Sequence, residues 1–410
     1  MLRDELRELS KERKINRFAI ISLCIYFLFT YVGFIIPYVQ SVFLYLSALL
    51  AFLLIIVNKR FKINSYLIWY AAFTFMALIS CLFLDDVASI FNSVYNLVIV
   101  IVFAFSLFSI INKQRYIDWL FVLSEVGSFV LLLYLLLTDS FFFSDTGERL
   151  GQTLTGNANT FASIYMFAAC ISVYFIIRFK DKKKRITFLV VFILQMLTLV
   201  LSAGRKFFLI PLLLLYIMLV MNKDKNGKRH YIKYTVIAVC IATALYFMLT
   251  KIQFFYETIG VRFEEMLSYY FGGADSADFS TMEREKMRRA AIELWEQRPV
   301  FGHGLDAFTS IAGFGTYSHS NFTELLCNHG LVGFLLYYSF FAVSIVRIVR
   351  LRYSLDKNFL LGMIICILIF DFGAVTYNGF FFQMMIILIV CMLEFKVKEE
   401  RLLTPTEELK

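Results

Sequence analysis

A polar stretch over residues 281–333 carries the side chains of this chain that are best suited to chemistry. Arg284 and Arg288 are four residues apart, so on a helix they share one face. Two guanidinium groups on one face can hold phosphate oxygens in a bidentate manner. Glu283 and Glu285 flank them, so a surface helix with ordinary ion pairs is the alternative interpretation.

His319, Asn321 and Glu324 follow in the same stretch, shortly before an apolar run. This close spacing allows them to share one helical end. Histidine titrates near neutral pH, so His319 could accept a proton from a hydroxyl group while the amide or the carboxylate orients it. The alternative is a helix cap beside an exposed histidine.

Two further cationic positions lie upstream, each next to an apolar run. Arg149 precedes a turn rich in Gly and Asn. Asn157, Asn159 and Thr160 can cap the helix that follows, whose N-terminal N–H groups favour an anion. Arg205 lies in a short turn between two apolar runs, where a charge near membrane depth usually faces a polar cavity or a partner. The alternatives are a solvated arginine beside a capped helix and a side chain that reaches out to lipid phosphate.

The composition indicates which elements must position these side chains. The chain has 410 residues, of which 60% are hydrophobic, and a mean hydropathy of +0.72. Repeated apolar windows of about 20 residues are typical of helices that cross a bilayer. We therefore predict an all-α polytopic membrane protein with about 12 transmembrane helices. The windows fall at residues 18–37, 41–57, 64–84, 93–112, 116–137, 159–177, 186–203, 206–221, 232–250, 329–346, 358–377 and 379–394.

The spans divide the chain into five segments. Residues 1–17 form a basic amphipathic segment in the cytosol, 18–250 hold spans 1–9, 251–328 form a large helical extracytoplasmic loop that we expect to be catalytic, 329–394 hold spans 10–12, and 395–410 form a cytosolic tail. With this assignment most of the 40 Lys and Arg residues lie on the cytosolic side, in agreement with the positive-inside rule. We expect a multi-pass protein of the cytoplasmic membrane of the cell, with both termini in the cytosol.

Other features limit the function classes. The net charge of +9 follows the predicted topology, so it gives no reason to expect a nucleic-acid partner. The seven cysteines are scattered without a paired spacing, so neither a disulfide nor a metal site is indicated. Glu125, Asp371 and Glu394 lie in or near apolar runs, where acids are usually functional, but the sequence names no partner for them.

The combination of motifs resembles the O-antigen ligase / Wzy polymerase superfamily. One departure is that Ser320 separates His319 from Asn321, whereas the family shows His followed directly by Asn. The plan of about 12 spans with one large outer loop late in the chain matches the family from end to end. The motif positions that carry the resemblance are Arg149, Gly151, Asn157, Asn159, Arg205, Arg284, Pro299, Gly302, Gly304, His319, Asn321, Glu324, Gly330 and Gly333.

The resemblance implies a GT-C-type membrane glycosyltransferase that works without a metal or another cofactor. Its substrate would be an undecaprenyl-diphosphate-linked oligosaccharide at the outer face of the membrane. By resemblance, His319, Arg284 and Arg205 are expected to be catalytic, and the expected substrate-binding residues are Arg149, Arg288, Asn321, Glu324 and Asn159. Expected partners besides the substrate are membrane lipids, a chain-length regulator and a flippase.

Within this family, we favour a polymerase of polysaccharide repeat units for a capsule, an exopolysaccharide or an O-antigen. The residue usage, rich in Lys, Ile, Phe and Asn, looks like that of an AT-rich, Gram-positive genome, and such a cell has no lipid A core for a ligase to modify. An O-antigen ligase-type transferase to another acceptor is the first alternative. A polysaccharide transporter or flippase is the second, although the two halves of the chain show no related pattern. A purely structural assembly partner is the third.

Overall fold

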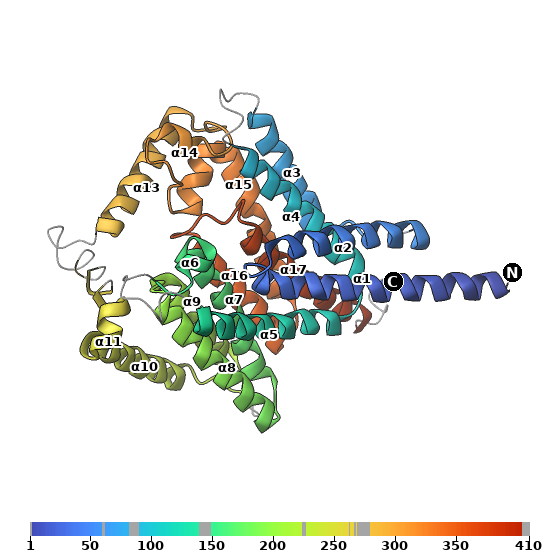
Figure 1. Cartoon of the computed structure of the whole chain (residues 1–410), viewed down its shortest axis with the longest axis horizontal. Coiled ribbons are helices and arrows are strands. Elements are labelled where there is room, and N and C mark those ends of the chain that lie inside the picture. Colours follow the sequence, from blue (N-terminus) through green and yellow to red (C-terminus); the bar gives the residue numbers. More distant parts are fainter. Residues whose placement is uncertain are drawn as a thin grey trace. The chain divides into compact units, whose positions relative to one another are not determined.

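A computed structural model describes residues 2–59, 62–81, 90–138, 149–223, 227–261, 263–265, 268 and 279–403. Within these ranges the regular structure is helical, and no strand occurs (Figure 1). This confirms the predicted all-α class. Parts of three predicted segments lie outside the described residues: 139–148 between the fifth and sixth predicted spans, 262, 266–267 and 269–278 of the predicted large loop, and 404–410 of the predicted tail.

Each predicted apolar window overlaps a long helix. Nine helices in the described part of the chain are long and apolar enough to cross a membrane, which fits a polytopic membrane protein. Three others, α3, α9 and α16, have 16 or 17 residues and fall below the length expected for a full span. The twelve helices are α1 (Leu2–Val32), α2 (Pro37–Asn58), α3 (Ser65–Ser80), α4 (Phe91–Ile110), α5 (Gln114–Thr138), α7 (Ala158–Arg178), α8 (Lys182–Leu201), α9 (Arg205–Met221), α10 (Tyr231–Lys251), α15 (Asn321–Arg350), α16 (Leu355–Phe370) and α17 (Phe380–Leu403).

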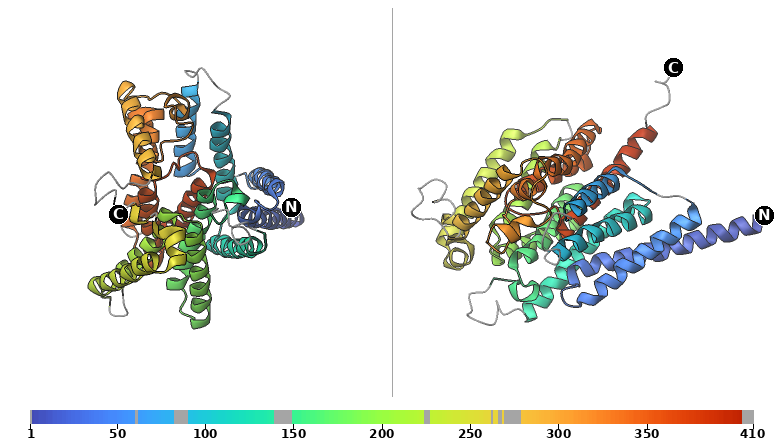
Figure 2. Two further views of the ribbon diagram at one scale, coloured as in Figure 1. Left: turned by 60° about the vertical axis from the view of Figure 1, so that its left-hand side comes forward. Right: turned by 90° about the horizontal axis from the view of Figure 1, so that it is seen from above.

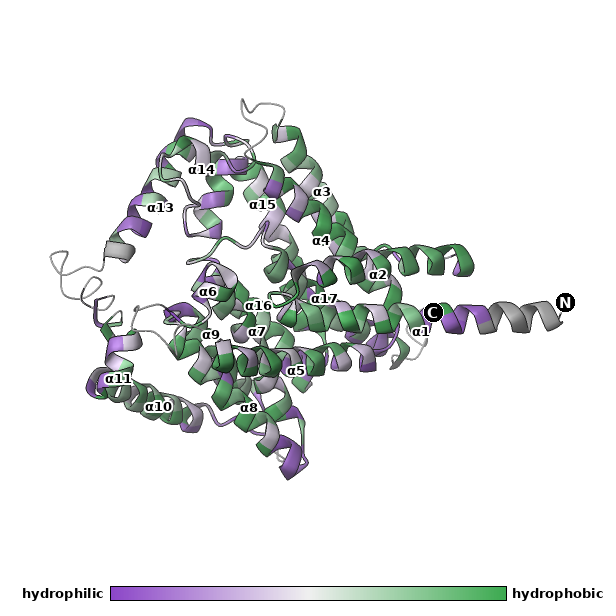
Figure 3. Ribbon diagram, viewed as in Figure 1, coloured by the Kyte–Doolittle hydropathy of each residue, from purple (hydrophilic) through white to green (hydrophobic). Residues whose placement is uncertain are grey.

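The remaining regular structure in the described residues consists of five short or polar helices. They are α6 (Gln152–Thr155), α11 (Gln253–Phe255), the π-helix η4 (Tyr256–Gly260), α13 (Phe279–Gln297) and α14 (Ala307–Ile311). Figure 3 shows polar residues along α13, in contrast to the apolar colour of the long helices. The segment predicted as a large loop is therefore helical over much of its described length.

The chain divides into two compact units. Unit 1 contains Met1–Ser124, Met287–Arg352 and Asp371–Lys410, and unit 2 contains Glu125–Lys286 and Tyr353–Phe370. Both units combine segments that are far apart in the sequence. Their cores are therefore built from long-range packing and not from consecutive helices alone.

Unit 1 packs α1, α2, α3, α4, α15 and α17 around a core rich in aromatic rings. α1 lies beside α2 (Figure 2). The indole of Trp69 stacks on Phe340 with 4.4 Å between ring centroids, and Tyr66 and Tyr70 stack at 5.6 Å. Such aromatic pairs add about 0.5–1.5 kcal/mol beyond the burial of their area. The Trp69–Phe340 pair joins α3 to α15, whereas the tyrosine pair lies within α3.

Unit 2 is centred on α7, which packs against α8 and α9 and has 89% of its apolar window buried. A polar network joins three of its helices inside the bundle. Gln195 Nε2 of α8 donates to Glu125 Oε2 of α5 at 2.6 Å, and Ser172 Oγ of α7 lies 3.0 Å from the same oxygen. Glu125 thus has partners that its sequence context does not reveal. By contrast, only 6% of the α10 window is buried, which leaves most of its apolar surface outside the bundle.

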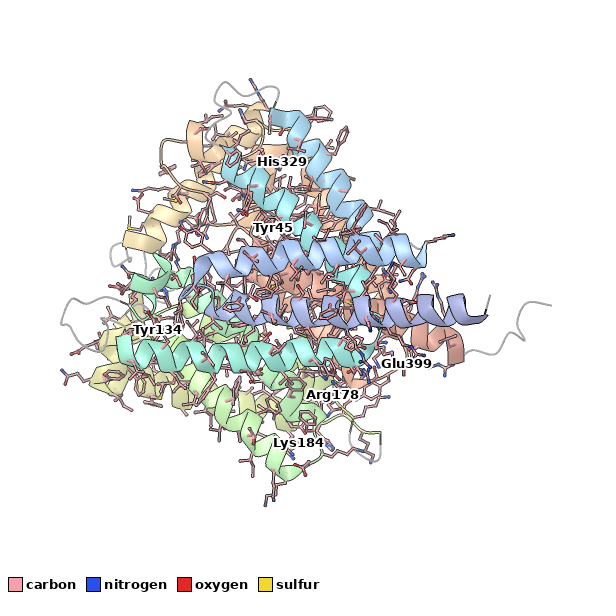
Figure 4. All side chains as sticks on the ribbon, turned by 45° about the vertical axis from the view of Figure 1, so that its right-hand side comes forward. Tyr45, Tyr134, Arg178, Lys184, His329 and Glu399 are labelled. Atoms are coloured by element: carbon pink, nitrogen blue, oxygen red, sulfur yellow. The ribbon has the colours of Figure 1, made fainter. Side chains whose placement is uncertain are left out.

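Basic side chains gather at one end of α7 and α8, in the connection predicted to be cytosolic. Figure 4 labels Arg178 and Lys184, which lie at this end. The guanidinium carbon of Arg178 lies 5.2 Å from the centroid of the Tyr174 ring, and Lys184 Nζ lies 5.5 Å from that of Phe179. These cation–π contacts place the charges over aromatic rings at the end of the bundle.

Candidate active site

Helix α13 places Arg284 and Arg288 on one side, as the sequence predicts. Its neighbouring face packs through Ala291 onto Phe308 and Cys327, with Met287 and Leu294 at the edge of this cluster. Both arginines are half-buried. The flanking acid Glu283 pairs with Lys286 at 2.8 Å, so this carboxylate already has a partner in the next turn of its own helix.

The glycine motif after α13 forms a backbone contact that we call the glycine clasp, made by residues 299–304 against residues 327–332. Helix α15 is broken at Gly330, where φ is 61° and ψ is −166°. Four hydrogen bonds close the clasp: Leu331 N to Pro299 O (2.8 Å), Val332 N to Val300 O (3.1 Å), His303 N to Cys327 O (2.9 Å) and Gly304 N to Asn328 O (2.8 Å).

The glycines of the clasp are needed for close approach. A Cβ atom on Gly302 would lie 2.6 Å from the backbone of Asn328, and one on Gly330 would lie 2.4 Å from the Val300 carbonyl oxygen. Both residues also have a positive φ, which suits glycine. Close backbone packing in the clasp therefore accounts for glycine at positions 302 and 330. A role in phosphate binding is not needed to explain these two residues.

His319 lies in a short turn, residues 318–320, directly before α15. We call it the His319 turn. Ser318 and Ser320 on either side are buried, whereas His319 is half-buried. The backbone of His319 is left-handed, with φ of 59°, and its ring lies 4.5 Å from the ring of Tyr317. A non-glycine residue in this region is uncommon and is often found at functional sites.

Glu324 lies beneath this turn and is 1% exposed. Its Oε2 accepts a 2.6 Å hydrogen bond from the backbone N–H of Ser318, and its Oε1 accepts from Asn328 Nδ2 at 3.1 Å. Asn328 is held in turn, because its Oδ1 accepts from the backbone N–H of Phe308 at 2.9 Å. The carboxylate of Glu324 is therefore fully engaged within unit 1.

Asn321 is the first residue of α15 and is completely buried. Its Oδ1 accepts from the N–H groups of Thr376 (2.9 Å) and Tyr377 (3.0 Å), and its own N–H donates to the Asp371 carbonyl at 2.8 Å. Its Nδ2 donates to the hydroxyl of Tyr338 at 3.0 Å. These bonds describe a positioning role for Asn321, and a direct contact with substrate stays a prediction.

Asp371, whose partners the sequence does not reveal, belongs to the same network. Its Oδ2 accepts from the Tyr338 hydroxyl at 2.9 Å and its Oδ1 from the Thr376 hydroxyl at 2.7 Å. The backbone after α16 is thereby folded back onto the start of α15. Asp371 and Asn321 together fix the position at which α15 begins, immediately after His319.

The other two histidines of the stretch are core residues. His303 is 8% exposed, and its Nε2 lies 2.8 Å from the Leu294 carbonyl oxygen. His329 is 2% exposed and lies between the rings of Phe73 and Tyr377, at 5.4 Å and 5.6 Å (Figure 4). Both side chains are enclosed by protein, so His319 is the histidine of this stretch that is the most open to a ligand.

Unit 2 holds a second group of predicted site residues, which we call the cationic turn: Arg149, Asn159 and residues 202–205. Arg149 Nε donates to the Ser202 carbonyl at 2.7 Å, and a terminal nitrogen of its guanidinium donates to Asn159 Oδ1 at 3.3 Å. The turn between α8 and α9 is short, and Arg205 is the first residue of α9. The structure therefore brings Arg149 and Asn159 to the turn that carries Arg205.

Helix ends add to the electrostatics of the cationic turn. Asn157 caps α7, because its side chain accepts from the N–H of Asn159 at 2.8 Å, as the sequence predicts. Gly204 is the N-cap of α9. The N-terminal turn of a helix carries a partial positive charge and favours anions. Lys206, next along the chain, has its Nζ 4.9 Å from the centroid of the Phe370 ring.

An apolar groove lies alongside α9 in the same unit. It has a volume of about 550 Å³ and runs between α9 and α10, starting at Phe208, within one turn of Arg205. Leucine, isoleucine and other apolar side chains dominate its lining, among them Leu212, Ile237, Ile241 and Leu245. The groove and the cationic turn thus share helix α9.

Comparison with known proteins identifies part of the chain. Residues 190–338 match the family model Wzy_C, described as O-antigen ligase. The match includes Arg205, Arg284, Arg288, His319, Asn321 and Glu324, and Arg149 and Asn159 lie before it. No curated protein matches the chain. The family implies a membrane enzyme of the glycosyltransferase kind. Residues 190–338 of this chain are therefore similar to the O-antigen ligase family, which confirms the predicted resemblance to the O-antigen ligase / Wzy superfamily.

Proposed function

We propose that the protein is a GT-C-type polymerase of polysaccharide repeat units. It transfers a glycan from an undecaprenyl-diphosphate-linked donor to a hydroxyl group of a lipid-linked acceptor, without a metal ion. The observation that carries this proposal is the surface of unit 2, where a cationic turn and a long apolar groove begin on the same helix, α9. A molecule with a diphosphate head and a long apolar chain matches both parts.

The cationic turn fits the diphosphate. Arg149 is oriented by two hydrogen bonds, to Ser202 and Asn159, and Arg205 stands at the positive end of α9. Fixed positive groups stabilise the negative charge that develops on a leaving diphosphate, and they need no reorganisation at the moment of reaction. In this proposal Arg284 and Arg288 of α13 contribute further guanidinium groups to the same substrate.

The apolar groove fits the lipid chain. A polyprenyl chain in the bilayer gains little from hydrophobicity alone when it leaves other lipids, so its binding depends on close packing in a matching surface. The groove offers branched aliphatic side chains from two helices over several turns. An isoprenoid chain in the groove would leave its diphosphate near Arg205.

His319 completes the reaction in this proposal. The acceptor hydroxyl gives its proton to the imidazole, and its oxygen forms a bond to the anomeric carbon of the donor glycan. The bond between that carbon and the diphosphate oxygen breaks, and the lipid diphosphate leaves with the electron pair. General-base catalysis of this kind contributes roughly 10²–10⁴-fold to a rate.

The test uses full-length protein in nanodiscs with one lipid-linked repeat unit, in buffer containing a chelator. A ladder of lipid-linked products of increasing length is the expected result. An unchanged substrate in the presence of correctly folded protein would contradict the proposal.

A ligase-type transfer is the second candidate, because the matching family model carries that description. It predicts no ladder from the repeat unit alone, and a single transfer when a different acceptor is added. A flippase would instead move the lipid-linked unit across a vesicle membrane without lengthening it.

A further inference from the structure

The conformation of His319 requires an explanation from its surroundings. A left-handed backbone is sterically unfavourable for a non-glycine residue, and such strain persists only where neighbouring contacts fix it. His319 has φ of 59°, and both of its neighbours in the chain are buried. The turn is thus held on either side while the imidazole is left half-buried.

The bond that holds the turn is the one from Ser318 N to Glu324 Oε2. It is 2.6 Å long and buried, and its acceptor is a carboxyl oxygen of Glu324. Two further contacts of the turn are longer, since the Ser318 hydroxyl lies 3.1 Å from the Ser320 carbonyl oxygen and 3.0 Å from the Thr323 hydroxyl. Asn328 fixes the second carboxylate oxygen, so Glu324 has no freedom to turn away.

We propose that Glu324 is the positioning residue for His319: it holds the amide of Ser318 and thereby fixes the left-handed backbone that presents the imidazole to the acceptor. This inference rests on the proposed function, which gives His319 its role. Glu324 itself is 1% exposed and bonded to protein on both oxygens, so it acts through the backbone and does not touch substrate.

Two conservative substitutions distinguish positioning of the Ser318 amide by Glu324 from an electrostatic effect of the Glu324 charge. E324Q keeps the length of the side chain and a carbonyl oxygen that can accept from Ser318, but removes the charge. E324D keeps the charge but shortens the side chain by one CH₂ group, which moves the acceptor away from the amide. A displacement of about 1 Å near the reacting atoms costs about 100-fold in rate.

In the polymerisation assay, kcat of E324D is expected to fall about 100-fold with KM within about twofold of the wild type, and kcat of E324Q to stay within about tenfold. E296D is the matched control, because it makes the same shortening at an exposed glutamate of α13; its kcat should be near the wild-type value. The reverse order, with E324D more active than E324Q, would overturn the proposal, as would an E296D variant as slow as E324D.

A double-mutant cycle tests whether Glu324 acts through His319. If it does, H319A/E324D is as slow as H319A alone, because a misplaced imidazole and a missing one are equivalent. Independent, multiplying losses would contradict the positioning role.

Hydrogen exchange separates a failure of this inference from a failure of the proposed function. Whatever reaction the protein catalyses, the amides of residues 317–320 should exchange at least tenfold faster in E324D than in the wild type, while the α15 amides after Gly330 stay protected. Unchanged exchange in the His319 turn would refute the inference even if polymerase activity is found. Faster exchange without any polymer would support the positioning of His319 and refute the polymerase.

Discussion

The His319 turn of unit 1 and the cationic turn of unit 2 are built alike and used differently. Each precedes a long helix, and each contains one non-glycine residue in the left-handed region, His319 with φ of 59° and Ala203 with φ of 53°. In the first turn the left-handed residue carries the imidazole that we propose as the general base. In the second it is a buried alanine, and the charged groups are its neighbours.

The two regions also treat charge differently. Around His319 the carboxylates of Glu324 and Asp371 are buried and accept hydrogen bonds from protein groups, so their effect stays inside the fold. In the cationic turn a backbone carbonyl and an amide oxygen orient the Arg149 guanidinium. We therefore expect unit 1 to determine the rate of transfer and unit 2 to determine the affinity for the donor.

The largest effect is expected at His319. H319A should lower kcat about 10³-fold and leave the donor KM within about twofold, because it removes the group that accepts the proton. Steady-state kinetics on lipid-linked repeat units measure both constants. His230, exposed before α10, provides the control, and H230A should behave as the wild type. If KM of H319A rises by as large a factor as kcat falls, His319 also contributes to donor affinity. The assignment of rate to unit 1 and affinity to unit 2 would then be wrong.

The next effect is expected at Arg149. A charge-assisted hydrogen bond is worth about 1.5–3 kcal/mol, so R149A should raise the donor KM about 10- to 100-fold. R149K keeps the charge but cannot make both the Ser202 and the Asn159 bonds, and it should lie between R149A and the wild type. Arg178, at the opposite end of α7, is the control arginine. If R149A changes kcat and leaves KM unchanged, the cationic turn acts in the transfer step and not in donor binding.

The positions of the long helices could be predicted from the sequence, because their signals are local, but several of their ends could not. The first and last windows end at residues 37 and 394, whereas α1 ends at Val32 and α17 at Leu403. Apolar windows of about 20 residues locate the long helices. The Asn157 cap and the arginine spacing on α13 also depend only on residues within one or two turns of each other. Signals that span only one or two helical turns can be read from a short segment of the sequence alone.

The partners within the candidate site could not be predicted, because they are distant in the sequence. Asn321 meets Asp371 from 50 residues away, and Arg149 meets Ser202 from 53 residues away. No periodicity links positions at such separations. The G-x-G motif is a related case. Gly302 is required because the backbone of Asn328 approaches it closely, and this contact is known only from the folded position of α15.

Stability of the glycine clasp tests the rigidity of unit 1. G302A should destabilise the fold by about 2–5 kcal/mol, because a Cβ atom would overlap the Asn328 backbone and the residue would keep its positive φ. Gly313 is a matched control, with φ of 76° and open space around it, so G313A should cost only about 1 kcal/mol. Thermal unfolding in detergent compares the two. Equal losses would mean that the close backbone contact does not stabilise unit 1.

The smallest effect concerns Asp306, where unit 1 keeps a carboxyl half-buried outside the spans. Burial raises the pKa of Asp306 above its ordinary value of 3.8, and the hydrogen bond from Ser93 offsets part of this. The folded protein thus holds the proton more tightly than the unfolded chain does. The contribution of this carboxyl to stability is complete below pH 3.8 and is lost as the pH rises through the raised pKa.

D306N removes this dependence, because an amide does not ionise. Asparagine also tolerates the left-handed backbone at this position, where φ is 58°, and its oxygen can still accept from Ser93. The variant should unfold at the same temperature as the wild type in acid and at a slightly higher temperature at neutral pH. Melting curves from about pH 3 to about pH 8, which run from below the ordinary pKa of Asp to well above it, measure the difference. If the wild type is instead more stable than D306N at pH 8, the charged carboxylate of Asp306 stabilises the fold at that pH. Unit 1 would then, like unit 2, contain an ionised side chain with a favourable role outside the spans.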